Sequence, residues 1–355
     1  MKHRFAAALT ALTLLTLPAA VLPAGAPLTA QAESLGELTY AVYTDHVVIT
    51  DCDKAAVSVT IPEEIDGLPV TGIGWHAFMS CTSLSTIVIP ESVTSIGYGA
   101  FSDTAWYDSQ PDGMVYAGRV AYGYKGTCTG EIVLRPDTAG IADECFSGQK
   151  ELTSVTIPEG VTSIGEDAFK GCTGLTSVTI PEGVKSIWNF AFYGCTSLTS
   201  VTIPESVTSI GVHAVYGTPF LEEKRAEDPL VIFGQTVYDG TTCVGDVVIP
   251  ESVTSISYYA FSCAADVTSI TVLNPACEMS NAIICQSMKD EFFFANIGDE
   301  YASHAYYSYF YGTIYGYEGS TAQEYVNSRR TTFDYTYYYG YKFVSIESQI
   351  GRAHV

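Results

Sequence analysis

The chain has 355 residues, a formal net charge of −23 and a sequence pI near 4.4. Nucleic acids and anionic membrane surfaces bind clusters of Lys and Arg, so this charge argues against both as partners. An apolar fraction of 47%, with 25 Tyr, excludes a disordered chain.

Residues 1–32 have the features of a secretory signal peptide. Lys2 and Arg4 precede a long apolar run, and Ala30-Gln31-Ala32 resembles a cleavage site. The alternative is a membrane-spanning anchor, but Pro18 interrupts the run before it reaches the roughly 20 residues that a span needs. We therefore predict an exported chain that is secreted or attached to the cell surface, with no membrane insertion after cleavage.

Residues 33–56 are expected to form an N-terminal β-hairpin cap. Two alternating apolar runs, at 38–42 and 47–49, flank a turn at Thr44-Asp45. A solenoid exposes an apolar core and open strand edges at its ends, so a cap is needed before the repeats that follow.

Residues 57–285 carry a repeat with a period of about 23 residues. It is clearest between Leu152 and Pro204, where Ile157, Ile180 and Ile203 are each followed by Pro and Glu. Within each unit, the phrase L-x-x-V-x-I fits the leucine-rich-repeat signature. We predict a β-rich leucine-rich-repeat solenoid, right-handed, with about ten coils of about 23 residues.

Each regular coil is expected to contain two strands and one core ring. The L-x-x-V-x-I phrase forms the first strand, which Pro ends because it cannot donate to the ladder. The phrase V-T-S-I forms a shorter strand on the opposite side, and an Ala-Phe pair follows. The Phe residues predicted to form an interior column are Phe78, Phe101, Phe146, Phe169, Phe192 and Phe261.

Two inserts, at 104–130 and 218–245, interrupt the period and resemble each other. Each contains two Val-rich runs around a hairpin turn, at Ala117-Gly118 and at Phe233-Gly234. Breaks in a repeat pattern are good candidates for specificity, so the insert aromatics are our predicted ligand contacts, although a core-packing role remains an equal alternative. These residues are Trp106, Tyr107, Tyr116, Tyr122, Phe220, Phe233 and Tyr238.

Residues 286–349 are expected to form a Tyr-rich C-terminal cap. Ser320 is placed to cap a short helix, and a strand is expected near the end, from Tyr341 to Ile346. Residues 350–355 resemble the translation of a sequencing adaptor, so we treat them as an artefact and expect that the natural C-terminus is missing.

The ten cysteines are interpreted mainly as packing residues. Cys81, Cys172 and Cys195 share one repeat position, and Cys128 and Cys243 share another. A small apolar residue recurring at one coil position favours buried thiols over a disulfide framework, which remains the alternative for an exported protein.

Two ladders of polar residues are further candidate surfaces. Solenoids bind ligands on extended concave faces, and Ser and Thr should point outward from the strands, although Thr also favours strands for its own β-propensity. The second ladder is a Glu after each strand-ending Pro. It is interpreted either as a row of carboxylates that binds divalent cations or a basic partner, or as a solvated turn residue. The Ser/Thr ladder includes Thr153, Ser154, Thr156, Thr176, Ser177, Thr179, Thr199, Ser200, Thr202, Thr268, Ser269 and Thr271, and the Glu ladder is Glu63, Glu91, Glu159, Glu182, Glu205 and Glu251.

Catalytic and metal-binding motifs are sparse. There is no C-x-x-C, H-E-x-x-H, G-x-S-x-G or Walker loop in the sequence. His76 and His213 share one repeat position, before the Ala-Phe type pair, where other coils place Asp, Phe or Tyr. We interpret that position as a tolerant surface slot, and we predict no catalytic residues, no metal and no cofactor.

The repeat I-P-E-x-V-T-S-I-G-x-x-A-F-x-x-C-x-x-L resembles the BspA-type leucine-rich repeat of bacterial secreted and surface proteins. This resemblance covers residues 57–285 and implies an extracellular role in binding proteins, cells or polysaccharide, without implying a shared ligand. We predict a non-catalytic binding or adhesion module for a protein or glycan ligand. The alternative is a recruitment scaffold for a missing C-terminal anchor or dockerin-type module.

Overall fold

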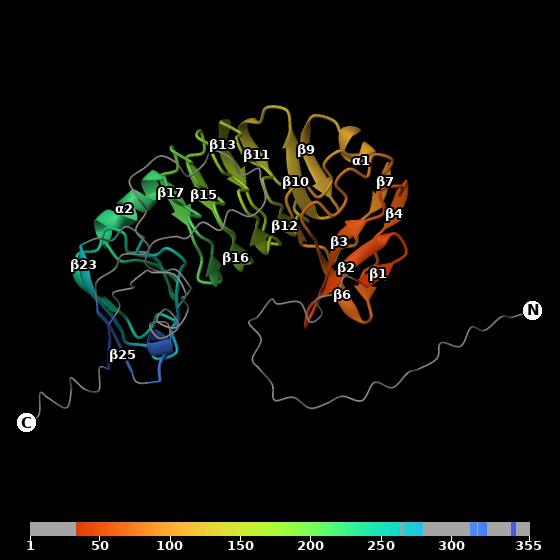
Figure 1. Ribbon diagram of the computed structural model, residues 1–355. Coiled ribbons are helices and arrows are strands. Elements are labelled where there is room, and N and C mark those ends of the chain that lie inside the picture. The colour runs from red at the N-terminus through yellow and green to blue at the C-terminus, as the bar shows by residue number, and fades with distance from the viewer. Residues whose placement is uncertain are drawn as a thin grey trace, which may run out of the picture.

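The computed structural model describes residues 33–279 except 263 and 265, residues 313–324 except 318, and residues 342–345. These residues form a β-solenoid of about ten turns with little helix. The solenoid curves into an arch (Figure 1). The predicted fold is therefore confirmed, whereas the predicted signal peptide and the adaptor-like residues 350–355 lie outside the described residues.

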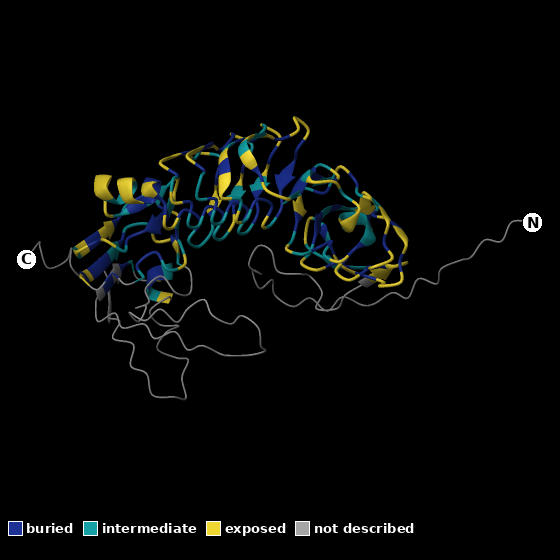
Figure 2. Ribbon diagram, turned by 90° about the horizontal axis from the view of Figure 1, so that it is seen from above, coloured by how far each residue is buried: buried dark blue, intermediate teal, exposed yellow. Residues whose placement is uncertain are grey.

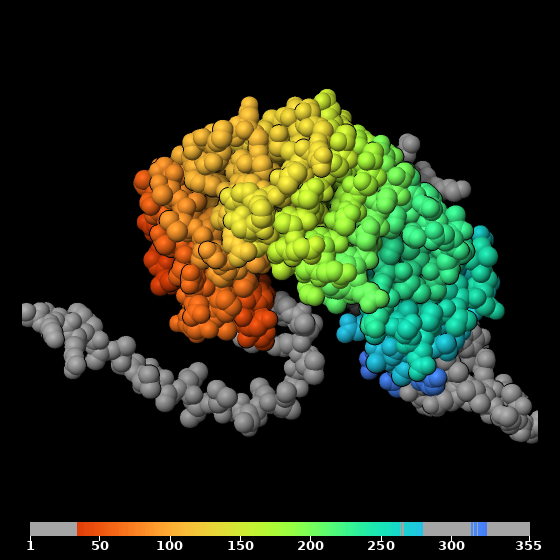
Figure 3. Space-filling view, turned by 180° about the vertical axis from the view of Figure 1, so that it is seen from behind, coloured from red at the N-terminus to blue at the C-terminus, as the bar shows by residue number. Residues whose placement is uncertain are grey.

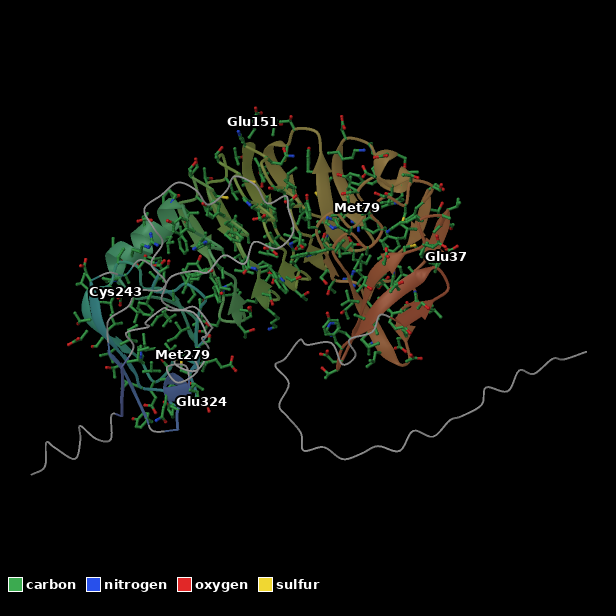
Figure 4. All side chains as sticks on the ribbon, viewed as in Figure 1. Glu37, Met79, Glu151, Cys243, Met279 and Glu324 are labelled. Carbon is green, nitrogen blue, oxygen red and sulfur yellow. The ribbon has the colours of Figure 1, made fainter. Side chains whose placement is uncertain are left out.

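The L-x-x-V-x-I phrases form the outer side of the arch. Figure 4 places Glu151, the first residue of one of these strands, at the outer rim. Neighbouring strands pair in parallel with Ser154 opposite Ser177 and Val155 opposite Val178, so equivalent residues of successive coils stack. The outer strands are β4 (Ser58–Thr60), β7 (Thr86–Val88), β11 (Thr129–Val133), β13 (Glu151–Thr156), β15 (Ser177–Thr179), β17 (Ser200–Thr202), β21 (Gly245–Ile249), β23 (Val267–Val272), β25 (Thr313–Gly316) and β26 (Lys342–Ser345).

The V-T-S-I phrases form shorter strands on the inner side of the arch. Figure 4 places Met279, the last residue of one of them, on that side. These strands also pair in parallel, with Ser163 opposite Ser186. The inner strands are β6 (Leu68–Ile73), β8 (Ser95–Ile96), β12 (Gly140–Ile141), β14 (Ser163–Ile164), β16 (Ser186–Ile187), β18 (Ser209–Ile210), β22 (Ser255–Ile256) and β24 (Glu278–Met279).

The predicted N-terminal hairpin is confirmed. β2 (Leu38–Val42) and β3 (Val47–Cys52) pair antiparallel, and β3 then pairs in parallel with β6. A strand that was not predicted, β1 (Glu33–Leu35), adds to the hairpin on the other side of β2. The first coil also contains a small hairpin between β5 (Glu64–Ile65) and β6.

A column of phenylalanine rings fills the space between the two sets of strands. Phe146, Phe169 and Phe192 are fully buried, and their rings stack with centroids 5.1 Å apart. This spacing follows from the rise of about 4.8 Å between parallel strands. Figure 2 shows the buried residues running through the row of coils. All six predicted column residues are at most 1% exposed, so the predicted spine is confirmed.

Both inserts are coils in which a hairpin replaces the usual pair of strands. β9 (Gly113–Ala117) and β10 (Val120–Lys125) pair with each other antiparallel, and β10 then pairs in parallel with β12. β19 (Val231–Phe233) and β20 (Thr236–Asp239) do the same, with β20 against β22. The predicted hairpins are confirmed. The two strands of these coils pair directly, and the hairpins place the buried rings of Tyr122 and Tyr238 beside Phe101 and Phe233.

Each insert begins with a helix that the sequence analysis missed. These helices are α1 (Ala105–Asp108) and α2 (Pro219–Glu227). The hydroxyl groups of Thr104 and Thr218 accept hydrogen bonds from the first turn of each helix, at 3.1 and 3.2 Å. Thr followed by Pro is a helix-start signal, and it was visible at the second insert.

The first insert bends the solenoid because it separates the flanking coils on the outer side, while parts of these coils still meet on the inner side. Figure 1 shows α1 and β9 between β7 and β11 along the outer rim. On the opposite side the flanking coils meet: Asp143 Oδ2 accepts hydrogen bonds from Trp75 Nε1 and from the Tyr98 amide, both at 3.1 Å. A wedge on one side produces curvature, and the resulting arch is also plain from behind (Figure 3).

A substitution at Gly140 tests this close approach of the two coils. It occupies the position of Ser163 and Ser186 in the regular coils, and a Cβ atom added there would lie 1.9 Å from the Thr94 carbonyl oxygen. We expect Gly140→Ser to lower the free energy of unfolding by about 1–3 kcal/mol, the usual cost of overpacking. Urea denaturation would measure it, with Ser186→Ala as a control that should change stability by less than about 0.5 kcal/mol. Equal stability of Gly140→Ser and the parent would contradict the wedge.

The eight described cysteines are buried and free. The thiols of Cys172 and Cys195 donate hydrogen bonds to the carbonyl groups of Phe146 and Phe169, each at 3.0 Å. Burial raises the pKa of the Cys172 thiol to about 12, so it is an unreactive packing group. The packing interpretation is confirmed for these eight; Cys263 and Cys285 lie outside the described residues.

The described part of the predicted C-terminal cap extends the outer sheet. β25 pairs in parallel with β23, and β26 pairs in parallel with β25. Residues 321–324 form one helical turn, and the hydroxyl of Ser320 accepts a hydrogen bond from the Gln323 amide at 3.4 Å. The predicted helix cap and final strand are therefore confirmed, and most of the Tyr-rich segment lies outside the described residues.

Candidate ligand-binding surface

Seven equivalent six-residue turns follow inner strands and together line one edge of the arch. We call this surface the turn edge. In each turn the fourth and fifth residues are the buried Ala-Phe type pair, whereas the first, second, third and sixth residues differ from coil to coil. The turns are residues 74–79, 97–102, 142–147, 165–170, 188–193, 211–216 and 257–262.

The third residue of every turn has a left-handed backbone. The φ angle is 55° at Phe190, 53° at His213 and 64° at Tyr259, and the His, Gly, Glu and Asp at this position in the other four coils are similar. This conformation costs a non-glycine residue roughly 1–2 kcal/mol, so the coil architecture holds it in place. The slot that we interpreted as tolerant accepts varied side chains, but in one fixed orientation.

An aromatic cluster covers the C-terminal part of the turn edge. We define it as Phe190, Tyr193, His213, Tyr216, Tyr258 and Tyr259. Tyr193 stacks on Tyr216 with centroids 5.8 Å apart, and His213 lies 5.0 Å from Tyr216 and 6.1 Å from Tyr259. The contact between His213 and Tyr259 crosses the second insert, as the Asp143 contacts cross the first.

Parts of this cluster face solvent. Tyr216 is 41% exposed, Tyr258 is 39% exposed, and neighbouring Trp188, the first residue of its turn, is 54% exposed. Burial lowers the pKa of His213, so this imidazole is kept neutral beside the rings. Exposed aromatic groups held by a rigid scaffold are typical of recognition surfaces.

An acidic cluster lies in the middle of the turn edge. We define it as Asp143 and Glu144 in one turn and Glu166 and Asp167 in the next. Burial raises the pKa of Glu144 and of Glu166, and repulsion from neighbouring carboxylates raises both pKa values further. Burial also raises the pKa of Asp143, against three hydrogen bonds that favour its charged form. The folded state thus keeps these charges close together at an electrostatic cost.

The stability of the variant Glu166→Gln at different pH values tests this electrostatic cost. When folding raises the pKa of a carboxyl group, the group contributes to stability at pH values below its unfolded pKa, which is 4.5 for Glu166. That contribution is lost as the pH rises through the folded-state pKa. The amide variant should therefore be more stable than the parent at pH 7, and the difference should vanish below pH 4.5. Urea denaturation at both pH values, with exposed Glu182→Gln as control, measures this. Lower stability of Glu166→Gln at pH 7 would contradict it.

A second aromatic group begins the turn edge at its N-terminal end. Trp75 is 63% exposed and Tyr98 is 46% exposed, and the His76 ring packs against Tyr98 with centroids 5.3 Å apart. Because Asp143 binds both Trp75 and Tyr98, this group adjoins the acidic cluster directly. Along the arch, the side chains of the turn edge are therefore aromatic at the N-terminal end, acidic in the middle and aromatic again at the C-terminal end.

The seven insert aromatics predicted to contact ligand lie in two separate groups. Tyr122, Phe220 and Tyr238 are buried, at 9, 5 and 6% exposure, and Trp106, Tyr107, Tyr116 and Phe233 are partly buried. The Tyr122 hydroxyl accepts a hydrogen bond from the Phe101 amide and the Tyr238 hydroxyl accepts one from the Val215 amide, both at 3.0 Å.

These two hydroxyls replace backbone acceptors. In a regular coil the amide of Phe169 donates to the carbonyl of Ala191 in the next coil, and a collapsed insert coil lacks that turn. The partly buried aromatics pack on the same core: Trp106 against Phe101, and Phe233 against Phe220. Their ligand contact stays a prediction.

The Ser/Thr ladder is mostly exposed, as predicted, but it lies on the outer side of the arch rather than on a concave face (Figure 1). The inserts widen that side, which is why it is convex. Ser269 departs from the pattern because it is 7% exposed and its hydroxyl donates to Asp246 Oδ1 at 2.6 Å. All six Glu of the Glu ladder are exposed. Among the described residues, no group of three or more His, Cys, Asp or Glu is placed to hold a metal ion.

Sequence reasoning missed the turn edge because its residues vary. A usable signal was present: the first three residues of the turns at 188–190 and 257–259 read WNF and SYY, whereas those at 165–167 read GED. Stacking coils at a fixed spacing places such positions side by side.

Comparison with known proteins gives a family match. The sequence model of the BspA type leucine rich repeat region matches in six copies, over residues 52–109, 120–241 and 168–289. A search of curated proteins gives no significant match. No helix among the described residues has the length and apolar character of a membrane span.

Several solved structures are similar to this chain. A leucine-rich repeat protein from Bacteroides ovatus is 22% identical over 70% of this chain and 66% of its own, with a TM-score of 0.33. A leucine rich cell surface protein from Faecalibacterium prausnitzii is 23% identical over 71% of this chain and 73% of its own, with a TM-score of 0.27. The T. pallidum leucine rich repeat protein is 25% identical over 56% of this chain and 95% of its own, with a TM-score of 0.27.

The chain thus spans just under two thirds of the Bacteroides ovatus protein. TM-scores of this size are low, so the assignment rests on the repeat matches, which cover more than half of the sequence. The chain belongs to the BspA type leucine-rich repeat family.

Proposed function

We propose that this protein is an extracellular, non-catalytic binding or adhesion module that holds a protein or glycan ligand on its turn edge. The observation that carries the proposal is the contrast within each six-residue turn. The fourth and fifth residues keep the core constant, while the others place exposed Trp188, Tyr216 and Tyr258 on a rigid scaffold.

The other repeated surfaces offer less to a ligand. The Ser/Thr ladder presents short hydroxyl side chains of one kind, and the Glu ladder presents one solvated carboxylate per coil. Interface cores are enriched in Tyr, Trp and Phe, and binding hot spots in Tyr and Trp. The turn edge carries such residues in five of its seven turns, either as exposed or as partly buried side chains.

Export is supported by the signal-peptide features of residues 1–32. The charge of −23 supports a partner other than nucleic acid. Non-catalytic action is supported by the absence of known catalytic motifs from the sequence and of metal-binding groups from its described part.

An array of extracellular matrix proteins and purified polysaccharides, probed with the full chain, tests the proposal. We expect saturable binding of at least one array component and no turnover in a broad hydrolase screen. Silence across the array would contradict the binding role, and reproducible turnover would contradict the non-catalytic role.

A further inference from the structure

The turn edge already binds cations of its own chain. Lys170 Nζ lies 3.0 Å from Asp167 Oδ2 and 5.6 Å from the centre of the Phe190 ring. The Arg225 guanidinium lies 5.8 Å from the Tyr216 ring centre. A cation is attracted to the face of an aromatic ring within about 6 Å. Two neighbouring turns of the aromatic cluster, those of Phe190 and Tyr216, therefore each place a ring beside a cation of the chain.

The acidic cluster is not neutralised by these internal cations. Its four carboxylates contact one ammonium group, Lys170, among the described residues. Asp167 Oδ1 is shielded from solvent and has no hydrogen-bond partner in the described part of the chain. A positive charge placed beside the exposed side of the cluster would relieve the repulsion that raises the pKa values of Glu144 and Glu166.

The dimensions of the surface suit a short extended peptide. Trp75 and Trp188 lie in the first and fifth turns of the edge, and the Asp143 contacts bridge the first insert between them. Four steps of about 4.8 Å give about 19 Å, which is the length of about six residues in an extended strand. The order along this line is aromatic, acidic, aromatic.

We infer that the ligand of the turn edge is a polypeptide segment rich in Lys or Arg, a conclusion that rests on the function proposed above. Its cationic side chains bind the acidic cluster, and its flanking apolar or aromatic side chains pack on Trp75 and Tyr98 at one end and on Trp188 and the aromatic cluster at the other. The chain's charge of −23 draws such a segment toward the surface from a distance. A neutral glycan packs on the rings and its hydroxyls donate hydrogen bonds to the carboxylates, but it brings no positive charge to offset their mutual repulsion.

Fluorescence anisotropy with two labelled six-residue peptides tests the inference. One peptide has Lys at its four central positions and Tyr at both ends; the other has Gln in place of Lys. We expect the Lys peptide to bind at least tenfold more tightly than the Gln peptide in 0.1 M salt, and its affinity to fall as the salt concentration rises.

Two variants of equal charge separate local contact from general attraction. The edge variant Glu144→Gln/Glu166→Gln removes two charges of the acidic cluster, and the control variant Glu182→Gln/Glu205→Gln removes two exposed charges of the Glu ladder. Both replacements are isosteric, and circular dichroism would confirm that both variants fold. We expect the edge variant to bind the Lys peptide at least tenfold more weakly, and the control variant to change binding less than twofold.

Three results would overturn the inference. Equal losses in both variants would show non-specific attraction to an acidic protein. Equal binding of the Lys and Gln peptides would show that the carboxylates are not used. A glycan from the array whose binding depends on the turn edge, with no binding of either peptide, would leave the proposed function standing and remove the polypeptide ligand.

Discussion

Phe169→Ala is expected to lower the free energy of unfolding by about 3–5 kcal/mol, as for other buried aromatic residues. The Phe169 ring is fully buried and stacks on Phe146 and Phe192, each with centroids 5.1 Å away. Parallel strands on both sides hold these neighbours in place, so the cavity cannot close. The loss should be near the upper end of the range.

Urea denaturation of the full chain measures this effect. Thr179→Ala, on the exposed face of the neighbouring outer strand β15, is the control and should change stability by less than about 0.5 kcal/mol. A loss below about 1 kcal/mol for Phe169→Ala would show that the column can collapse around a gap. The stacked column would then not be the main support of the fold.

Asp239→Ala is expected to cost about 3–5 kcal/mol, because it breaks a buried ion pair and leaves the Arg225 guanidinium with Glu222, whose side chain is exposed, as its charged partner among the described residues. The Arg225 side chain is 12% exposed and the Asp239 side chain is 8% exposed, and the two are joined by hydrogen bonds of 2.7 and 3.1 Å. This pair fastens α2 to β20, so the second insert should loosen when it is broken.

A variant that replaces both partners distinguishes the penalty of breaking the ion pair from the cost of burying its two charges. Replacing both partners, as Arg225→Met/Asp239→Leu, should recover much of the stability, because an apolar pair of similar volume avoids burying charge. Urea denaturation of the parent and of these two variants provides the test. Little loss in Asp239→Ala, or no recovery in the double variant, would contradict the buried ion pair.

The regular part of the fold was predictable because each coil repeats the same pairing. Once Ile157, Ile180 and Ile203 establish the period, parallel stacking follows by translation, and Ser177 must lie between Ser154 and Ser200. The apolar positions then face inward in every coil. Local pattern and global fold agree here, which is why the strands and the Phe column were correct.

The inserts were predicted in part. Their hairpins follow from the turns at Gly118 and Gly234, which have φ angles of 60° and 58°. The curvature could not be predicted, because it depends on contacts between coils that the insert separates in sequence, such as Trp75 with Asp143. The same unforeseen curvature placed the Ser/Thr ladder on the convex side.

The turn edge was missed because the variation of residue type at its turn positions was interpreted as a sign that any residue is tolerated there. Phe190, His213 and Tyr259 occupy one turn position in three coils and look unrelated in the sequence. Their left-handed backbones aim them along one edge, and the collapsed second insert brings His213 against Tyr259. Proximity of this kind comes from the fold and not from sequence spacing.

The most direct test of the turn edge as the binding surface compares the affinities of two surface variants for a ligand that the array identifies. Trp188→Gly/Tyr216→Ser alters the turn edge with residues that other coils have at the same turn positions. Ser177→Ala/Thr202→Ala alters the Ser/Thr ladder. We predict at least a tenfold loss of affinity for the edge variant and parental affinity for the ladder variant. Parental affinity of the edge variant, or a loss confined to the ladder variant, would contradict the turn edge as the binding surface.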